Sequence, residues 1–149
     1  MLTLAPALPC LTLLPHHSLP PAKAEAVVKE IKASGGQAIA VGGNVMDDGF
    51  AKKLVDATVA AFGQINHIVN NAGFTSDKML HTMSDDTFRL ILEAHNVAPF
   101  RIVREAAPFL RNKDAQAKAQ NRSIVNVSSI AGVHGGVGQA NCELGARAV

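Results

Sequence analysis

The chain of 149 residues contains no tyrosine and no tryptophan, and it has two cysteines. Without tyrosine, no phenol is available as a general acid or base. Cys10 and Cys142 lie far apart and form no CxxC or Cys/His pattern, and the pair His16 and His17 has no further ligand nearby, so no disulfide framework or metal site is predicted. The 14 Lys and Arg against 12 Asp and Glu include no basic run, which excludes an electrostatic surface for nucleic acid or anionic lipid.

Glycine, lysine and arginine are absent from residues 1–21, which hold five of the seven prolines. Three of these prolines interrupt the apolar stretch 1–19, which also falls short of the roughly 20 apolar residues of a membrane-spanning helix. The stretch lacks the basic residues of a secretory signal or transit peptide. We interpret 1–21 as a proline-rich leader unrelated to the remainder, with a cytoplasmic location as the default.

From Ala22 onward, helical patterns alternate with short apolar strands. Helices are predicted over 22–34, from Asp47 or Asp48 as cap to 62, and over 84–110 with a bend at Pro99, and strands over 37–41, 65–70 and 123–127. This alternation predicts an α/β fold with a parallel sheet, whose ligands bind beyond the carboxyl ends of the strands. Polar clusters at Asn44, Asn70–Asn71 and Ser128–Ser129 follow three of those ends. Any one cluster is more readily explained as an ordinary turn, and only the three together make a ligand site an equal alternative.

Three motifs together resemble the short-chain dehydrogenase/reductase family, and most closely its 3-oxoacyl-[acyl-carrier-protein] reductases. They are NNAG at 70–73, SIVNVSSIAG at 123–132 and GQAN at 138–141. The likeness covers about residues 22–141 and implies that 22–149 is a partial NAD(P)-binding domain with a doubly wound Rossmann-type sheet. It also implies hydride transfer between NADP or NAD and a carbonyl carbon, such as that of a 3-oxoacyl thioester.

The resemblance implies roles for specific residues of this chain. The implied cofactor-binding residues are Asn44 and Val45 beside the adenine, and Asn71, Ala72 and Gly73 along the cofactor cleft. Ser129 takes the place of the catalytic serine, whose hydroxyl hydrogen-bonds the substrate oxygen where charge develops.

The chain departs from the family pattern at the other catalytic positions. Cys142 and Ala146 stand where the family has its proton-transferring tyrosine and its lysine. The family's asparagine position falls on His95, with Asn96 beside it. Either His95 or Asn96 is a candidate for the role of that asparagine. The remaining interpretation is that His95 is a histidine on the helix surface without a role in the site.

The glycine-rich phosphate loop and the first two and last strands of the family sheet have no counterpart in the sequence pattern. The strands at 65–70 and 123–127 are then the fourth and fifth, which are neighbours in this topology. The strand at 37–41 is the third, and its backbone lacks a partner unless Leu2 to Leu14 pairs with it. The prolines within Leu2 to Leu14 would allow that segment to form only an edge strand. We therefore expect a truncated or misread gene product.

Three functions remain open. The first is an NAD(P)-dependent carbonyl reductase that is inactive in this form. The second is a non-catalytic fragment or pseudo-subunit that associates with a full-length short-chain reductase, or with itself, through the helix at 85–110. The third is an unstable product without function. No nucleic-acid or membrane partner is expected.

Overall fold

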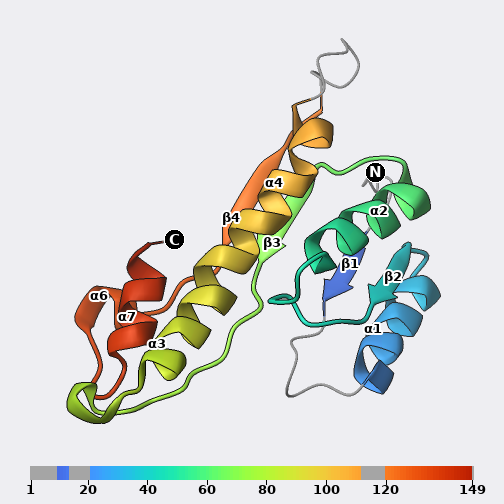
Figure 1. The fold of residues 1–149 in the computed structure, drawn as a ribbon. Helices are drawn as coiled ribbons and strands as arrows, with labels where there is room; N and C mark the ends of the chain where they lie inside the picture. The colour runs from blue at the N-terminus through green and yellow to red at the C-terminus, as the bar shows by residue number, and fades with distance from the viewer. Residues whose placement is uncertain (1–9, 14–20, 112–119, 149) are drawn as a thin grey trace. The chain divides into compact units, whose positions relative to one another are not determined.

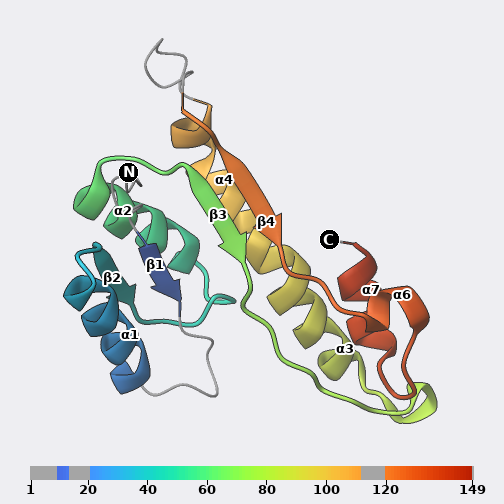
Figure 2. The ribbon, with the colours of Figure 1, turned by 180° about the vertical axis from the view of Figure 1, so that it is seen from behind.

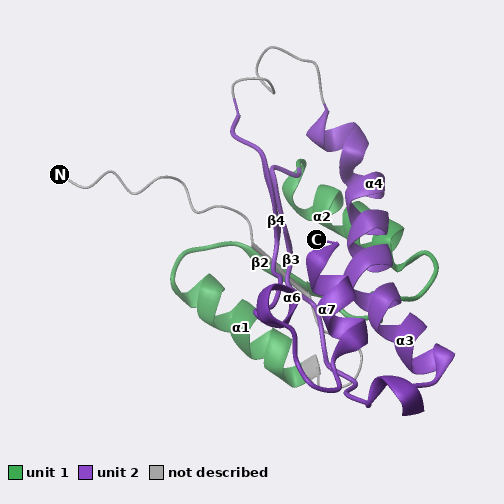
Figure 3. Cartoon of the chain, turned by 90° about the vertical axis from the view of Figure 1, so that its left-hand side faces the viewer, with its two compact units in different colours: residues 1–64 green, residues 65–149 purple. Residues whose placement is uncertain are grey.

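The computed structural model describes residues 10–13, 21–111 and 120–148. The chain divides into two compact units, residues 1–64 and 65–149, which Figure 3 shows in different colours. Each unit contains one two-stranded sheet. Within the described ranges, no helix is both long enough and apolar enough to cross a bilayer.

The first unit has the order strand, helix, strand, helix (Figure 1). Its elements are β1 (Cys10–Leu13), α1 (Pro21–Ala33), β2 (Ala38–Val41) and α2 (Phe50–Phe62). The two strands are parallel, with Cys10 opposite Ala38 and Leu13 opposite Val41. The buried side chains come from both helices, from β2 and from the turn after it: Ala24, Ala38, Val41, Val45, Phe50, Ala51, Leu54 and Val55.

Strand β1 lies inside the segment that sequence analysis interpreted as an unrelated leader. Cys10–Leu13 is the part of that segment between Pro9 and Pro15, so a four-residue strand forms without placing a proline in its ladder. It supplies the partner that the backbone of β2 requires. The strand at 37–41 therefore has its hydrogen-bonding partner within Leu2 to Leu14, the segment considered for that role.

The predicted cap of α2 by Asp47 or Asp48 is wrong. The residue before the helix is Gly49, in a left-handed conformation with φ 85°, and no side chain caps the helix. Asp47 instead accepts a hydrogen bond from Asn44 Nδ2 through its own Oδ1, and its carbonyl accepts one from the Phe50 amide. The Asp47 carboxylate is therefore bonded within the turn before α2 and does not cap the helix.

The second unit pairs β3 (His67–Asn70) with β4 (Ser123–Asn126) in parallel. His67 lies opposite Ser123 and Asn70 opposite Asn126, which confirms the predicted adjacency of these strands. The helical elements are η1 (Leu80–Thr82), α3 (Asp85–Leu92), the π-helical segment η2 (Glu93–Val97), α4 (Ala98–Leu110), α6 (Ala131–His134) and α7 (Ala140–Arg147). Figure 2 shows the strand pair in front of α4, which runs alongside it.

The predicted long helix forms as α3, η2 and α4 in succession. Ser84, where the helix was predicted to begin, caps it, because Ser84 Oγ accepts a hydrogen bond of 3.2 Å from the Thr87 amide. Pro99 occupies the first turn of α4 and has no N–H to continue the regular α-helical ladder. The π-helical turn Glu93–Val97 precedes it, so the predicted irregularity at Pro99 takes the form of a wider turn.

Candidate functional site

The carboxyl ends of β3 and β4 are joined side by side. Asn70 Nδ2 donates to Asn126 Oδ1 at 2.7 Å, and the Val127 amide donates to the Asn70 carbonyl at 2.9 Å. The chain therefore leaves the sheet at Asn71 and at Ser128 from adjacent positions, and both residues are exposed. The structure thus brings two of the three predicted polar clusters to one edge of one sheet.

Gly73 lies directly against His95. A Cβ at position 73 would come within 2.6 Å of His95 Cε1, so only glycine fits there without a shift of the ring. His95 Nε2 lies 2.9 Å from the Phe74 carbonyl oxygen and 3.4 Å from the Phe74 amide nitrogen. Because a carbonyl oxygen can only accept, the shorter contact requires a proton on Nε2. His95 therefore holds the turn that follows β3 and is not an uninvolved surface residue.

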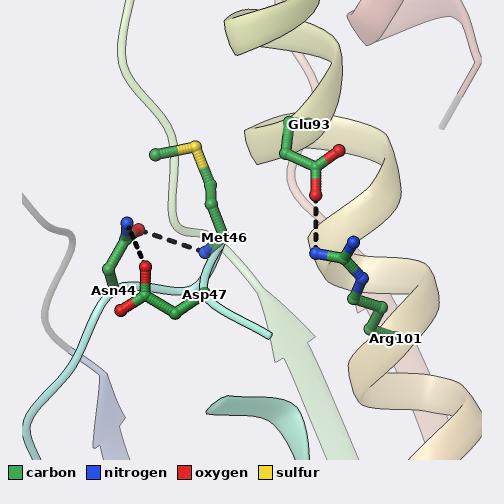
Figure 4. A network of polar contacts seen from close by, with 5 residues as sticks. All are labelled: Asn44, Met46, Asp47, Glu93 and Arg101. Carbon is green, nitrogen blue, oxygen red and sulfur yellow. Dashed lines mark hydrogen bonds and ion pairs between the residues drawn. The ribbon is translucent and has the colours of Figure 1, made fainter. Parts of the chain in front are cut away.

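Asn96 points to a different element. Its Nδ2 donates to the Gly145 carbonyl of α7 at 3.2 Å, and its Oδ1 is buried without a hydrogen-bond partner. The side chains of His95 and Asn96 both come from the π-helical turn. An ion pair of 2.5 Å between Glu93, at the start of this turn, and Arg101 of α4 spans the irregular segment (Figure 4). The turn thus directs His95 to the segment after β3 and Asn96 to α7.

The two serines after β4 make different contacts. Ser128 Oγ donates to the Ala146 carbonyl at 2.7 Å and so ties the strand end to α7. Ser129 Oγ accepts from the Ala131 amide at 3.2 Å at the start of α6. That bond uses an oxygen lone pair, so the Ser129 hydroxyl proton remains available for donation, and the residue is exposed.

The start of α7 is anchored by Asn141, which is fully buried. Its Nδ2 donates to the Ser76 carbonyl at 3.1 Å, and its Oδ1 accepts from the Cys142 amide at 2.8 Å. The Lys78 amide also donates to the Gly138 carbonyl at 2.8 Å. In the sequence, Asn141 stands out only as the last residue of the GQAN motif, and no periodic pattern reveals that its amide bridges two segments.

Cys142 and Ala146 lie one turn apart on α7, at the positions implied for tyrosine and lysine. Cys142 is buried, and burial raises the pKa of its thiol, although the Ser76 backbone lowers it and Asp77 and Glu143 raise it further. Ala146 Cβ would lie 2.8 Å from a Cβ at Gly132, because α6 and α7 pack closely there. This face of α7 carries a neutral thiol and a methyl group, and neither transfers a proton near neutral pH.

In the first unit, the Asn44 side chain is bound within its own loop. Its Oδ1 accepts from the Met46 amide at 3.1 Å, and its Nδ2 donates to Asp47 Oδ1 at 2.9 Å (Figure 4). Val45 is buried. His16 and His17 lie outside the described residues, and the remaining ranges contain no group of three or more His, Cys, Asp and Glu side chains that could hold a metal ion.

Comparison with known proteins identifies the family and the fold. A family model described as short chain dehydrogenase matches residues 17–141. The 3-oxoacyl-[acyl-carrier-protein] reductase FabG of Staphylococcus aureus strain Mu50 is 34% identical over 119 residues, which are 80% of this chain and 46% of that protein. The hydroxyacyl-CoA dehydrogenase ChsB1 of Mycobacterium tuberculosis is 39% identical over 121 residues, covering 77% of this chain and 38% of the relative.

A solved structure gives the same result. The crystal structure of a short chain dehydrogenase from Mycobacterium avium superposes with a TM-score of 0.74 and 37% sequence identity, over 83% of this chain and 44% of that one. The chain thus spans less than half the length of these relatives. On the family match and the shared α/β fold, the chain belongs to the short-chain dehydrogenase family.

Proposed function

We propose that this chain carries the scaffold of an NAD(P)-dependent oxidoreductase that transfers hydride to or from a carbonyl carbon, and that these 149 residues do not turn over unaided. The substrate class is a 3-oxoacyl thioester or a similar ketone. Two relatives support it, because one is named a 3-oxoacyl-[acyl-carrier-protein] reductase and the other a hydroxyacyl-CoA dehydrogenase. The exposed Asn71 and Ser129 after the paired strands support the location of the site.

The absence of turnover rests on one observation, the chemistry of α7. A carbonyl that accepts hydride must also accept a proton, and a positioned acid or base accelerates such a step by roughly 10²–10⁴-fold. Cys142 is buried with a raised pKa, and its side chain is much shorter than a tyrosine. Ala146 carries no ammonium to lower the pKa of a neighbouring acid. Ser129 alone can donate a hydrogen bond to the substrate oxygen but cannot replace both groups.

The described residues also do not fit the phosphates of a dinucleotide. A pyrophosphate is held by free backbone N–H groups at a helix start. Helix α1 begins at Pro21, which has no N–H, and residues 1–21 of the sequence contain no glycine. In the second unit, the His95 ring fills the space beside Gly73, which the resemblance assigns to the cofactor. We therefore expect weak binding of NADP or NAD, and we assign no catalytic step to it.

A second function, a non-catalytic subunit, is favoured by the surface of the α3–η2–α4 helix. Leu90 and Phe100 are exposed there, Phe100 at 60%, and Arg104 lies over the Phe100 ring at 5.3 Å. An exposed aromatic ring beside arginine is typical of residues that contribute strongly to protein interfaces. In this proposal the helix joins a full-length short-chain reductase in the cytoplasm.

Two measurements test these proposals. Oxidation of NADPH and NADH by the purified chain, with an acetoacetyl thioester as substrate, should not exceed the rate without protein. Turnover that disappears in Ser129→Ala would overturn the claim of inactivity. Co-expression with a full-length short-chain reductase should give a complex that Phe100→Asp disrupts, whereas failure to co-purify would reject the subunit function.

A further inference from the structure

The ion pair between Glu93 and Arg101 joins two residues that are eight positions apart in the α3–η2–α4 helix. In a continuous α-helix, residues at this spacing are separated by about 12 Å along the axis and by about 80° around it. Their side chains would then point from different faces of the helix. The pair nevertheless forms, with the Arg101 and Glu93 side chains 25% and 35% exposed (Figure 4). The helix between them must therefore depart from α-helical geometry.

The departure is the π-helical turn η2, whose hydrogen bond spans one residue more than in an α-helix. The Ala98 amide donates to the Glu93 carbonyl, five residues back, where an α-helical amide would donate to Ala94. With one residue absorbed by the turn, Glu93 and Arg101 are placed like residues seven apart in an α-helix, which differ by only about 20° around the axis. Long side chains in helices point back toward the N-terminus, so Arg101 extends toward Glu93. The ion pair thus fits the π-helical register and does not fit the α-helical one.

The register of this turn decides which contacts its side chains make. In the π-helical register the His95 ring lies against Gly73, and its Nε2 contacts the Phe74 carbonyl oxygen at 2.9 Å, while Asn96 Nδ2 donates to the Gly145 carbonyl of α7. A change to the α-helical register rotates the part before the turn against the part after it by about 100°. The two side chains could not then both keep their partners. The register therefore sets the contact between His95 and the segment after β3.

Pro99 loosens this part of the helix without selecting its register. A proline has no N–H, and its ring crowds the carbonyl four residues back, which a helix can accommodate by a simple kink. The ion pair between Glu93 and Arg101 differs, because it is an attraction that only the π-helical register satisfies. Charge-assisted bonds between arginine and a carboxylate are among the stronger hydrogen bonds in proteins.

We propose that Glu93 and Arg101 are positioning residues, whose ion pair holds the π-helical turn and thereby keeps the His95 ring on Gly73 and Phe74. The pair acts through His95 on the backbone that leaves β3 and carries the candidate site. Only the relevance of this device to ligand binding rests on the proposed function, since the device itself is a matter of helix register.

The test compares Glu93→Gln with the unmodified chain by NMR. Two signals report the register: the nuclear Overhauser effect between His95 Hε1 and the Gly73 α-protons, and hydrogen exchange at the Ala98 amide. Because glutamine keeps the shape of the side chain but not its charge, we expect the first signal to fall by at least about half and the exchange to speed up by about three- to tenfold. Asp85→Asn is the matched control. It removes a carboxylate of the same helix whose pair with Arg89, at 3.7 Å, is exposed, and it should leave both signals unchanged.

Substitutions of Arg101 test the other partner and keep the test decisive if Glu93→Gln fails to fold. Lysine keeps the charge without the planar fork of arginine, so Arg101→Lys should change both signals less than Arg101→Gln does. In the Glu93→Gln background, Arg101→Gln should have no further effect, because the pair is already broken.

Three results overturn the proposal. The first is unchanged signals in Glu93→Gln. The second is faster exchange by the same factor at all amides of the chain, which would make the pair a general contribution to stability. The third is loss of the His95 signal in Pro99→Ala with the ion pair intact, which would make the proline the cause of the turn. None of these measurements involves a nucleotide or a substrate, so their outcome is separate from that of the proposed function.

Discussion

The imidazole of His95 packs on the backbone at Gly73, and its Nε2 lies 2.9 Å from the carbonyl oxygen of Phe74. This relationship connects the π-helical turn of the long helix to the segment that follows β3. A side chain at position 73 would overlap the His95 ring. The first prediction concerns this packing.

Gly73→Ala should lower the free energy of unfolding by about 1–3 kcal/mol, because the added Cβ would overlap the His95 ring. Urea unfolding followed by circular dichroism measures the change. Gly42→Ala is the control, since a Cβ there meets nothing within 4 Å. In a His95→Ala background the cost of Gly73→Ala should largely disappear, and an unchanged cost would show that the ring is not its cause.

Asn141→Asp should destabilise the chain by about 2–4 kcal/mol at neutral pH. The isosteric carboxylate cannot donate to the Ser76 carbonyl, and it would be buried beside that oxygen. The loss should shrink as the pH falls, because a protonated carboxyl can donate again. Unfolding free energies of this variant and of the exposed-site control Asn121→Asp, at pH 7 and pH 4, would check both statements.

The raised pKa of Cys142 makes stability depend on pH in the alkaline range. The folded state holds the thiol proton more tightly than the unfolded state, whose pKa lies near the ordinary value of 9.0. Stability from this group is therefore complete below that value and is lost as pH rises through the folded pKa, with a slope of at most about 1.4 kcal/mol per pH unit. The difference in unfolding free energy between the unmodified chain and Cys142→Ala should narrow from pH 8 to pH 10.5. A constant difference would contradict a raised pKa.

Ser84→Ala should cost about 1 kcal/mol, because the Thr87 amide loses its acceptor at the start of α3. Ser84→Asp keeps an acceptor at the cap and should retain most of the stability. Thermal and urea unfolding of both variants measure the effect. Equal losses in the two variants would mean that the capping oxygen contributes nothing.

Short-range patterns predicted much of the fold. The alternation of apolar runs and helical faces located α1, β2, α2, β3, the α3–α4 helix and β4 to within a few residues. The Ser84 cap and the disturbance before Pro99 were also predictable, because each depends on one residue and its nearest turn. Asp47 shows where such reasoning fails, since two local hydrogen bonds compete for one carboxylate.

The contacts of the candidate site depended on tertiary packing. The family resemblance placed His95 and Asn96 near the site, but only the structure shows that one contacts Phe74 and the other Gly145. Strand β1 was predicted only as a condition, because the pattern of 1–21 does not show which residues would pair; its bounds and register are set by the pairing with β2. Periodicity and spacing do not predict which distant carbonyl accepts a hydrogen bond from a given side-chain amide.

Calorimetric titration of the purified chain with NADPH and NADH is the most direct test of the central claim, that the family scaffold is present here without its phosphate-binding and proton-transferring groups. The account predicts no saturable binding of either nucleotide at micromolar concentrations, because the sequence pattern contains no counterpart of the glycine-rich loop whose backbone N–H groups would hold the phosphates. Saturable micromolar binding that Asn71→Asp or Ser129→Ala weakens would contradict it and would indicate a working cofactor site.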